Sequence, residues 1–542
     1  MKPIRLAILI CSVLAVGVAC ATPDPEGDNA KPVSNFDLTV GVAAPGSLDP
    51  ARVDTESARW ILNQICDPLV SFDPSTGELL PGIAEAWAVS QDARRVTFNL
   101  REGIKFHDGE VLEATDYVAS LSRLVRPETQ SPFYHLLTNV VGYSEVRTQQ
   151  VPFLAGVTAP DPHTLVVELS EPFAPFPEVM ANPSVGAAVS TAAVNDPERD
   201  FDVRPVCAGP YKIDGTTGSE EQIGMVRFDD YEGAQPALQE DGRGYAATIR
   251  WRIAFDEQKA YEMFESGKVD VAAIPAAKLA QARESRASIS SSDSGHLTYV
   301  GLPVTQAGFD STPFRRALAL SMDRSAIVMD MLGRTRGIAE GFLPKSAGPA
   351  AALSACGEAF PPKPQTDAAR AAAEEAAAPP STLTLHLNDS GGHEHWMRAV
   401  ADQWQAALGV ETQLRSTDWE SYIELLKDPG ADGPFRLSWE VIYPSPEALL
   451  RPLFASDSPD NFTGYSNDRF DALLAEAAST VGPVERSEIY SQAAKVLCED
   501  VPAIPVWFGT DHVAFGPKLA FAGKTRTNVF GDPILRELKY LQ

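Results

Sequence analysis

The 542-residue sequence lacks the short motifs that mark many enzymes and nucleotide-binding proteins. G-x-S-x-G and H-E-x-x-H are absent, and no P-loop is complete. The nearest P-loop match, Ala522–Thr525, fails because Lys518 stands where the first glycine is required. His393 and His395 offer too few ligands for a metal, and we expect a solvated loop there, at the start of a helix. The sequence therefore predicts no catalytic site, no metal and no cofactor.

Basic residues are scarce relative to acidic ones. The chain has 45 lysines and arginines against 73 aspartates and glutamates, a formal net charge of −28. This excess repels nucleic acid and anionic lipid headgroups, so nucleic-acid binding is disfavoured. The acidity alone does not identify a ligand.

Long apolar runs are absent beyond the N-terminus. There, Leu6–Val18 follows Lys2 and Arg5, and it is too short to cross a bilayer as a stable helix. A basic start followed by a short apolar run predicts an export signal over residues 1–19. The sequence therefore predicts an extracytoplasmic protein.

Ala19-Cys20 resembles a bacterial lipoprotein cleavage site, and a Pro/Glu/Gly/Asp-rich stretch follows it. We therefore expect lipidation at Cys20, a tether over residues 20–34 and anchorage to the cell membrane on its periplasmic or cell-wall side. An ordinary signal peptide or an uncleaved anchor is the alternative. Cleavage before Cys20 would leave 43 basic and 73 acidic residues, a net charge of −30.

Cysteine is also rare. Beyond Cys20 the mature chain would keep four cysteines: Cys66, Cys207, Cys356 and Cys498. An even number in an exported protein favours two disulfides, and three connectivities are possible. No CxxC or Cys/His spacing indicates zinc, so these cysteines are expected to be structural.

A chain of this length should fold as two or three domains. Alternating apolar residues predict strands over 95–101 and 163–170, and a strand–helix–strand unit begins at residue 382. A pair of amphipathic helices is expected over 312–332, and a buried strand over 503–508. These patterns predict a mixed α/β protein.

The most strongly marked stretch is Leu79–Leu124, "LLPGIAEAWAVSQDARRVTFNLREGIKFHDGEVLEATDYVASLSRL". It resembles the signature of bacterial extracytoplasmic solute-binding protein family 5, the peptide, nickel and related binding lipoproteins of ABC importers. Further marks follow in family order, among them "GPYKI" at Gly209, "SGKVD" at Ser266, "FRRALALSMDR" at Phe314 and "NFTGYSNDRFDALL" at Asn461. The resemblance covers nearly all of the mature chain.

The resemblance implies a two-lobed periplasmic-binding-protein-like fold of type II, with an extra domain in the first lobe and the ligand in the cleft between the lobes. The first lobe would comprise residues 35–80, 196–297 and 506–542. The extra domain would comprise 81–195, and the second lobe 298–505. On these boundaries the resemblance implies the disulfides Cys66–Cys207 and Cys356–Cys498, each within one lobe.

In oligopeptide-binding members of the family, the peptide lies as an added strand between segments of the two lobes. The corresponding first-lobe segment here is Val53–Glu56. The facing second-lobe strand would be Trp439–Tyr443. Trp419 and Tyr465 are further aromatic candidates for the cleft; packing at a helix start is the alternative for Trp419, and a structural role is the favoured alternative for Tyr465. The ligand-binding residues implied by the resemblance are Asp54, Thr55, Glu56, Trp419, Trp439, Glu440, Val441, Ile442, Tyr443 and Tyr465.

One position departs from the family pattern. Peptide-binding members usually read Trp-x-x-Asp-Tyr in the second-lobe segment, and that aspartate pairs with the α-amino group of the peptide. Ile442 occupies this position here. A buried ammonium without a counter-charge costs several kcal/mol. Either Glu440, Asp418 or Asp54 supplies the charge, or the ligand has no cationic end there.

The resemblance implies a monomeric binding protein that captures a solute, most simply an oligopeptide, and delivers it to an ABC permease, with no chemistry of its own. A non-peptide solute such as a glycoside, an opine or a metal chelate is the first alternative. A non-transport lipoprotein of envelope biosynthesis is the second.

Overall fold

The computed structural model describes residues 32–33, 35–214, 222–232, 244–285, 287–376, 379–427, 432–523 and 525–541. The predicted signal peptide, Cys20 and most of the tether lie outside the described residues. At the end of the expected tether, Pro32–Val33 form strand β1, which pairs with β20 (Leu538–Leu541), itself paired with β19 (Leu519–Phe521). None of the helices within these ranges combines the length and apolarity that a membrane span requires.

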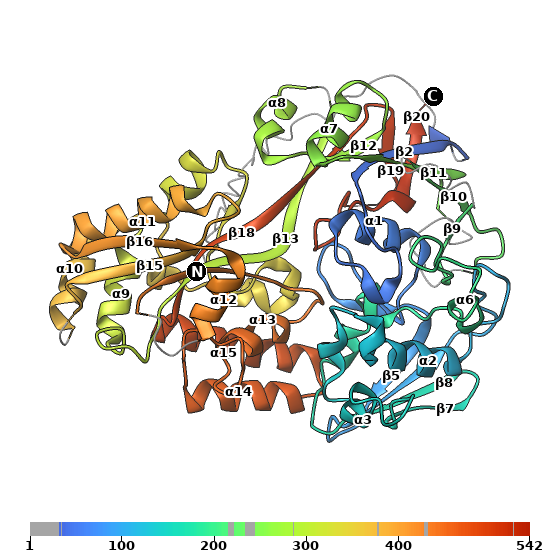
Figure 1. Ribbon diagram of the computed structural model, residues 1–542, viewed down its shortest axis with the longest axis horizontal. Helices are drawn as coiled ribbons and strands as arrows, with labels where there is room; N and C mark the ends of the chain where they lie inside the picture. The colour runs from blue at the N-terminus through green and yellow to red at the C-terminus, as the bar shows by residue number, and fades with distance from the viewer. Residues whose placement is uncertain are drawn as a thin grey trace, which may run out of the picture.

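One large mixed sheet runs through both halves of the molecule (Figure 1). Its strands lie in the order β16 (Glu411–Thr417), β15 (Thr382–Asn388), β17 (Phe435–Glu440), β13 (Ser288–Gly301), β18 (Ala503–Phe515), β12 (Val271–Ala273), β2 (Asp37–Ala43), β11 (Thr248–Ala254), β10 (Gln222–Arg227) and β9 (Tyr211–Ile213). The short strand β14 (Gly337–Ile338) pairs with β18 beside this path. The alternating segments at 382 and 411 are therefore strands, as predicted.

Strands β13 and β18 connect the two halves and lie side by side in antiparallel pairing (Figure 1). Their register shifts between Asp293 and Leu297, where Gly295 adopts a φ of +80°. A left-handed backbone conformation favours glycine, and a bulge bends and twists the strand that carries it. The crossing strands therefore bend at the point where they pass from one half to the other.

A second sheet lies in the predicted extra domain. Its strands are β5 (Ala84–Val89), β6 (Arg95–Leu100), β8 (Thr164–Glu168) and β7 (Val157–Asp161), in that spatial order, and β3 (Val70–Phe72) and β4 (Leu79–Pro81) form a separate hairpin. Val96, Phe98 and Leu100 alternate toward the core and are buried, which confirms the predicted strand.

Helices cover the sheets. They are α1 (Glu56–Ile65), α2 (Ala114–Val125), α3 (Tyr143–Arg147), α4 (Phe176–Val179), α5 (Pro183–Gly186), α6 (Thr191–Val194), α7 (Glu257–Glu265), α8 (Leu279–Arg283), α9 (Thr312–Leu320), α10 (Thr366–Glu375), α11 (His393–Leu408), α12 (Trp419–Lys427), α13 (Glu447–Phe454), α14 (Asp468–Ser479) and α15 (Pro483–Asp500). Gly409 caps α11 in the left-handed conformation, as its position in the sequence predicts.

Three local predictions need correction. The second helix expected within 312–332 is a π-helical turn, Ala326–Met331, closed by the hydrogen bond from the Leu332 amide to the Ile327 carbonyl. His393 and His395 lie in the first turn of α11 rather than in a loop, and the Trp396 indole donates to Nδ1 of His393 at 3.3 Å.

The third correction concerns the second-lobe segment. Strand β17 ends at Glu440, and the Val441 amide makes the last bond to β13, donating to the Gly295 carbonyl at 2.9 Å. Pro444 and Pro446 follow, and proline has no amide hydrogen with which to continue a ladder. The residues from Val441 onward therefore form a loop rather than the expected strand.

The two disulfides join Cys66 to Cys207 and Cys356 to Cys498, with Cα–Cα distances of 5.0 and 5.4 Å. These are the pairs that the family resemblance implies. Neither bond joins the sheet half that contains β2 to the half that contains β15, so neither prevents the halves from moving relative to each other.

Candidate functional site

A cavity of about 560 Å³ lies where the two halves and the smaller sheet region meet. The first half contributes the segment Val53–Glu56 and helix α1, and the second half contributes the loop that follows β17. The crossing strands supply His296 and Asp511, and a C-terminal loop supplies Asp532. Segments far apart in the sequence thus form one wall around an open space, as expected of a ligand site.

Most of the residues implied by the resemblance line this cavity. They are Asp54, Thr55, Glu56, Glu440, Val441, Ile442 and Tyr443. Thr55 is the N-cap of α1: its hydroxyl accepts from the Ala58 amide at 3.2 Å and donates to the Pro45 carbonyl at 2.7 Å. This cap fixes the direction in which the first turn of α1 presents Glu56.

Three of the implied residues lie elsewhere. Trp439 points away from the cavity, and its indole donates to the Ala448 carbonyl at 2.7 Å. Tyr465 is buried within the second half, where its hydroxyl donates to Asp500 at 2.6 Å. Trp419 begins α12 and is 51% exposed. Asp418, proposed as a source of charge, precedes Trp419 and is also absent from the cavity wall.

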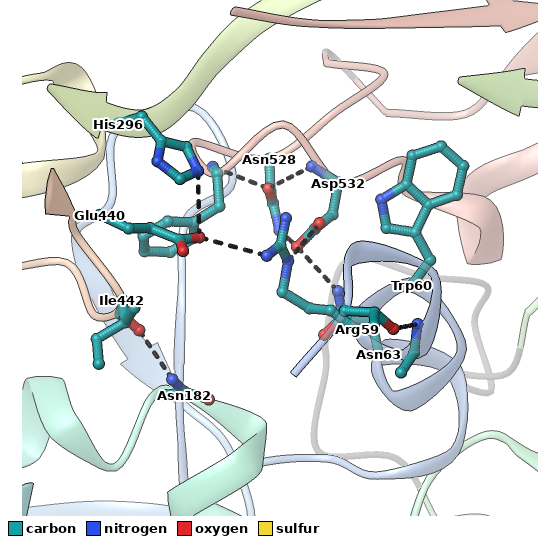
Figure 2. A network of polar contacts seen from close by, with 12 residues as sticks. Arg59, Trp60, Asn63, Asn182, His296, Glu440, Ile442, Asn528 and Asp532 are labelled. Atoms are coloured by element: carbon teal, nitrogen blue, oxygen red, sulfur yellow. Dashed lines mark hydrogen bonds and ion pairs between the residues drawn. The ribbon is translucent and has the colours of Figure 1, made fainter. Parts of the chain in front are cut away.

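Arg59 is the centre of the polar network in the cavity (Figure 2). Its Nε donates to Asp532 at 2.8 Å, and its terminal nitrogen lies 3.4 Å from a carboxylate oxygen of Glu440. Nε2 of His296 lies 3.7 Å from the same oxygen of Glu440. Arg59 therefore links the first half to the end of β17 in the second half.

Asp532 is held firmly in this network. Its side chain is almost fully buried and accepts hydrogen bonds from the side-chain amides of Asn63 at 3.1 Å and Asn528 at 3.3 Å (Figure 2). A buried carboxylate is stable only when it is paired and hydrogen-bonded. The contact between Arg59 and Asp532 is therefore the fixed part of the network, whereas the longer contact to Glu440 is the weaker part.

The pKa values in the cavity are strongly perturbed. Burial and the nearby Asp511 raise the pKa of Glu56 to about 8, and burial raises the pKa of Asp511 to about 7. Burial lowers the pKa of His296, an effect that Glu440 partly offsets. Burial also acts to lower the pKa of Arg59, but Asp532 and Glu440 outweigh it and raise that pKa. The guanidinium therefore stays charged, while Glu56 and Asp511 titrate near neutral pH.

Several main-chain groups of the second-lobe loop already form hydrogen bonds within the protein. The side-chain amide of Asn182 donates to the Ile442 carbonyl at 2.9 Å (Figure 2), and the Ser445 amide donates to the Tyr443 carbonyl at 2.7 Å. Together with the bond from Val441 to Gly295, these contacts hold the loop in one conformation. They also leave fewer of its main-chain groups for strand pairing with a peptide than the expected strand would offer.

Sequence reasoning missed Arg59, His296, Asp511 and Asp532. Two signals could have found some of them. Glu56, Arg59 and Asn63 recur at helical spacing and mark a polar face on α1. Asp511 places a carboxylate, between Thr510 and His512, within the mainly apolar strand β18, which is unusual for a strand in the middle of a sheet. Among the residues described, no group of three or more His, Cys, Asp and Glu side chains is arranged to hold a metal.

The fold and the cavity between its halves define a two-lobed solute-binding protein. The sequence model for bacterial extracellular solute-binding proteins, family 5 Middle, matches residues 78–461, and the chain belongs to this family. Members of such a family bind and deliver solutes rather than transform them.

Three known proteins illustrate the relationship. The chain is 26% identical over 488 residues to the probable deoxycholate-binding periplasmic protein YgiS of Escherichia coli K12, covering 86% of each chain. It is 26% identical over 495 residues to the periplasmic murein peptide-binding protein MppA of the same strain, covering 88% of each chain. The unliganded open form of MppA superimposes with a TM-score of 0.80 at 24% identity, covering 95% of this chain and 99% of that structure, which shows that the fold is shared.

Proposed function

We propose that the protein is the substrate-binding lipoprotein of an ABC importer and that it captures peptides outside the membrane for delivery to the permease. The observation that carries this proposal is the cavity formed jointly by Val53–Glu56 and Glu440–Tyr443. These are the two segments between which a peptide lies in oligopeptide-binding relatives. The name of the relative MppA, a murein peptide-binding protein, supports the same ligand class.

The proposed lobes are residues 35–80, 196–297 and 506–542 for the first and 298–505 for the second, with 81–195 as the extra domain. The positions of the crossing strands support these limits, because the register shift in β13 lies at 293–297 and β18 passes the same point near Phe508. A hinge there would let the lobes close over a ligand, and the permease would recognise the closed form.

Lipidation at Cys20 would hold the protein at the membrane next to its permease. The short apolar run and the small residue before Cys20 support this part of the proposal. The mass of the mature N-terminal peptide tests it, because a diacylglyceryl group adds a defined mass to that cysteine. An N-terminal peptide that carries no lipid would contradict it.

A non-peptide solute is the second candidate. Ile442 lacks the carboxylate that receives a peptide amino group in relatives, and the relative YgiS is named as a deoxycholate-binding protein. Native mass spectrometry of the purified protein separates the two candidates, because a retained ligand identifies itself by its mass.

The first test is a thermal-shift screen of ligand-stripped protein against peptides of two to five residues. We expect Tm to rise for a subset of these peptides, since a ligand that binds only the folded state stabilises it by mass action. The variant Ile442→Trp fills the cavity and should weaken peptide binding at least tenfold. Val484→Trp, at an exposed position on α15 outside the cavity, is the matched control and should bind normally. No response to any peptide would contradict the peptide proposal.

A further inference from the structure

Four carboxyl groups face one guanidinium in the cavity. Glu56, Glu440, Asp511 and Asp532 surround Arg59, but only Glu440 and Asp532 contact it, at 3.4 and 2.8 Å. Within the part of the chain that the structure describes, the carboxyl groups of Glu56 and Asp511 form no hydrogen bond or ion pair. The cluster therefore holds more acid than its own cation can neutralise.

The contacts of Arg59 show that this group of carboxylates binds a positive charge. Asp532 fixes its guanidinium through Nε, and the looser contact to Glu440 leaves that carboxylate open toward the cavity. A side-chain exposure of 36% agrees with an accessible Glu440. A second positive charge could therefore bind Glu440 without breaking the pair between Arg59 and Asp532.

One atom of a second polar side chain in the same cavity also lacks a partner. Gln64 lies on α1, lines the cavity and is 1% exposed, and its side-chain oxygen accepts no hydrogen bond from the described residues. Its side-chain nitrogen donates to the Trp60 carbonyl at 3.2 Å, so the oxygen is the side-chain atom left without a partner. A buried acceptor is normally satisfied, so this oxygen favours a ligand with an N–H donor.

We propose that the solute carries a cationic group, an ammonium or a guanidinium, and that this group binds between Glu440, Glu56 and Asp511. The inference rests on the proposed function only in taking this cavity as the solute site. In this proposal Glu440, Glu56 and Asp511 supply the negative charge that an aspartate supplies in peptide-binding relatives, where this chain has Ile442. Of the other candidates, Asp418 lies off the cavity and Asp54 is exposed at its edge.

The perturbed pKa values agree with this site. Burial raises the pKa of Glu56 to about 8 and that of Asp511 to about 7, as expected for carboxyl groups that lack a cation. The charged groups that face them are Arg59, Arg336, Glu257, Glu440 and Asp532, with His296 beside Glu440. A bound cation would favour the ionised form of both groups, so its binding should release protons near neutral pH.

Calorimetry with matched probes tests the proposal at pH 7.2, where an α-amino group, with a pKa of about 7.7–8.0, is still mostly protonated. The tripeptide Ala-Lys-Ala is compared with Ala-norleucine-Ala, each with a free and an acetylated N-terminus, and cadaverine serves as a non-peptide diamine. We expect the cationic probes to bind at least tenfold more tightly than their neutral counterparts. Comparison of the arms shows whether the ammonium is that of an N-terminus, a lysine side chain or a free amine.

Substitutions of the proposed carboxylates test whether they cause the preference for cationic probes. Glu440→Gln and Glu56→Gln should remove the preference for cationic probes, and Glu358→Gln, an exposed glutamate away from the cavity, should keep it. In the wild type the affinity for acetylated Ala-Lys-Ala, whose lysine stays protonated throughout, should fall as pH decreases from 8.5 to 6. Neutral probes that bind as tightly as cationic ones, or no binding of any cationic probe, would overturn the inference. Binding of cadaverine but of no peptide would support it while contradicting the peptide proposal.

Discussion

The carboxyl group of Glu56 illustrates how a single position combines structure and binding. Thr55 caps α1 and fixes the first turn, so Glu56 must face the cavity toward Asp511. Burial and that neighbour raise its pKa to about 8, against 4.5 for a free glutamate. The folded protein therefore binds this proton more tightly than the unfolded chain, and ionisation of Glu56 opposes folding.

We expect Glu56→Gln to stabilise the ligand-free protein at pH 8 and to change little at pH 4. Below pH 4, Glu56 of the wild type is protonated in both the folded and the unfolded state. Between about pH 4.5 and 8 its ionisation in the unfolded state lowers the stability of the wild type, whereas the variant has no carboxyl group at this position to ionise. The gain at pH 8 should be about 1–2 kcal/mol, allowing for screening by solvent in the cavity. Urea unfolding of wild type, Glu56→Gln and Glu358→Gln at both pH values measures it. A loss of stability at pH 8 in Glu56→Gln would contradict the raised pKa.

Some residues of the site could be predicted from the sequence and others could not. The segments that the family resemblance indicated, Val53–Glu56 and Glu440–Tyr443, were expected and do line the cavity. Arg59 and Asp532 were not, because they are 473 residues apart and no local pattern joins them. Trp439 was placed on the cavity wall although its indole bonds to Ala448, a contact that depends on where α13 packs.

Helices α4 and α15 meet where the region of the smaller sheet packs against the second half of the molecule. Arg486 forms an ion pair with Glu178, and both side chains are less than 10% exposed. The Ala174 amide also donates to the Ala478 carbonyl at 2.7 Å. The apolar cores of the two regions are continuous, whereas the residues around β2 and α1 form a separate core.

Replacement of Arg486 by methionine should destabilise the protein by about 3–5 kcal/mol, because it leaves Glu178 buried without its cation. The exposed pair Arg469–Glu499 offers a matched control, and Arg469→Met should cost less than about 1 kcal/mol. Chemical denaturation of the three proteins at pH 7 gives both values. Equal effects of the two substitutions would show that the buried pair contributes no more than a surface contact.

Elements with strong periodicity were the easiest to predict. The alternating strands at 95, 164 and 382 and the long helix α11 form because their apolar faces must be buried. The predictions failed where a distant backbone decides the structure. Pairing of the second-lobe segment with β13 ends after the bond from Val441 to Gly295, beside the bulge at 293–297, and no pattern within residues 437–446 encodes that bulge.

We expect the molecule to move as two lobes. Each disulfide lies within one half, and the crossing strands carry a bulge and a left-handed glycine between Asp293 and Leu297. Strands β15, β16 and β17 are parallel, so their carboxyl ends meet at the edge of the sheet where the cavity lies. In open α/β sheets this edge is where ligands bind.

Trp419 follows β16 at that edge, two strands from Glu440, and is 51% exposed in this structure. If the lobes close over a ligand, the first half should cover this indole. We therefore expect a binding peptide to shift the tryptophan emission to shorter wavelength and to reduce iodide quenching, since the indole leaves water. The variant Trp419→Phe should bind the peptide but lose most of this signal, because other tryptophans such as Trp60, Trp251 and Trp404 are already buried. Small-angle scattering of the same samples should show a smaller radius of gyration, and a saturating peptide that leaves the radius unchanged would contradict closure.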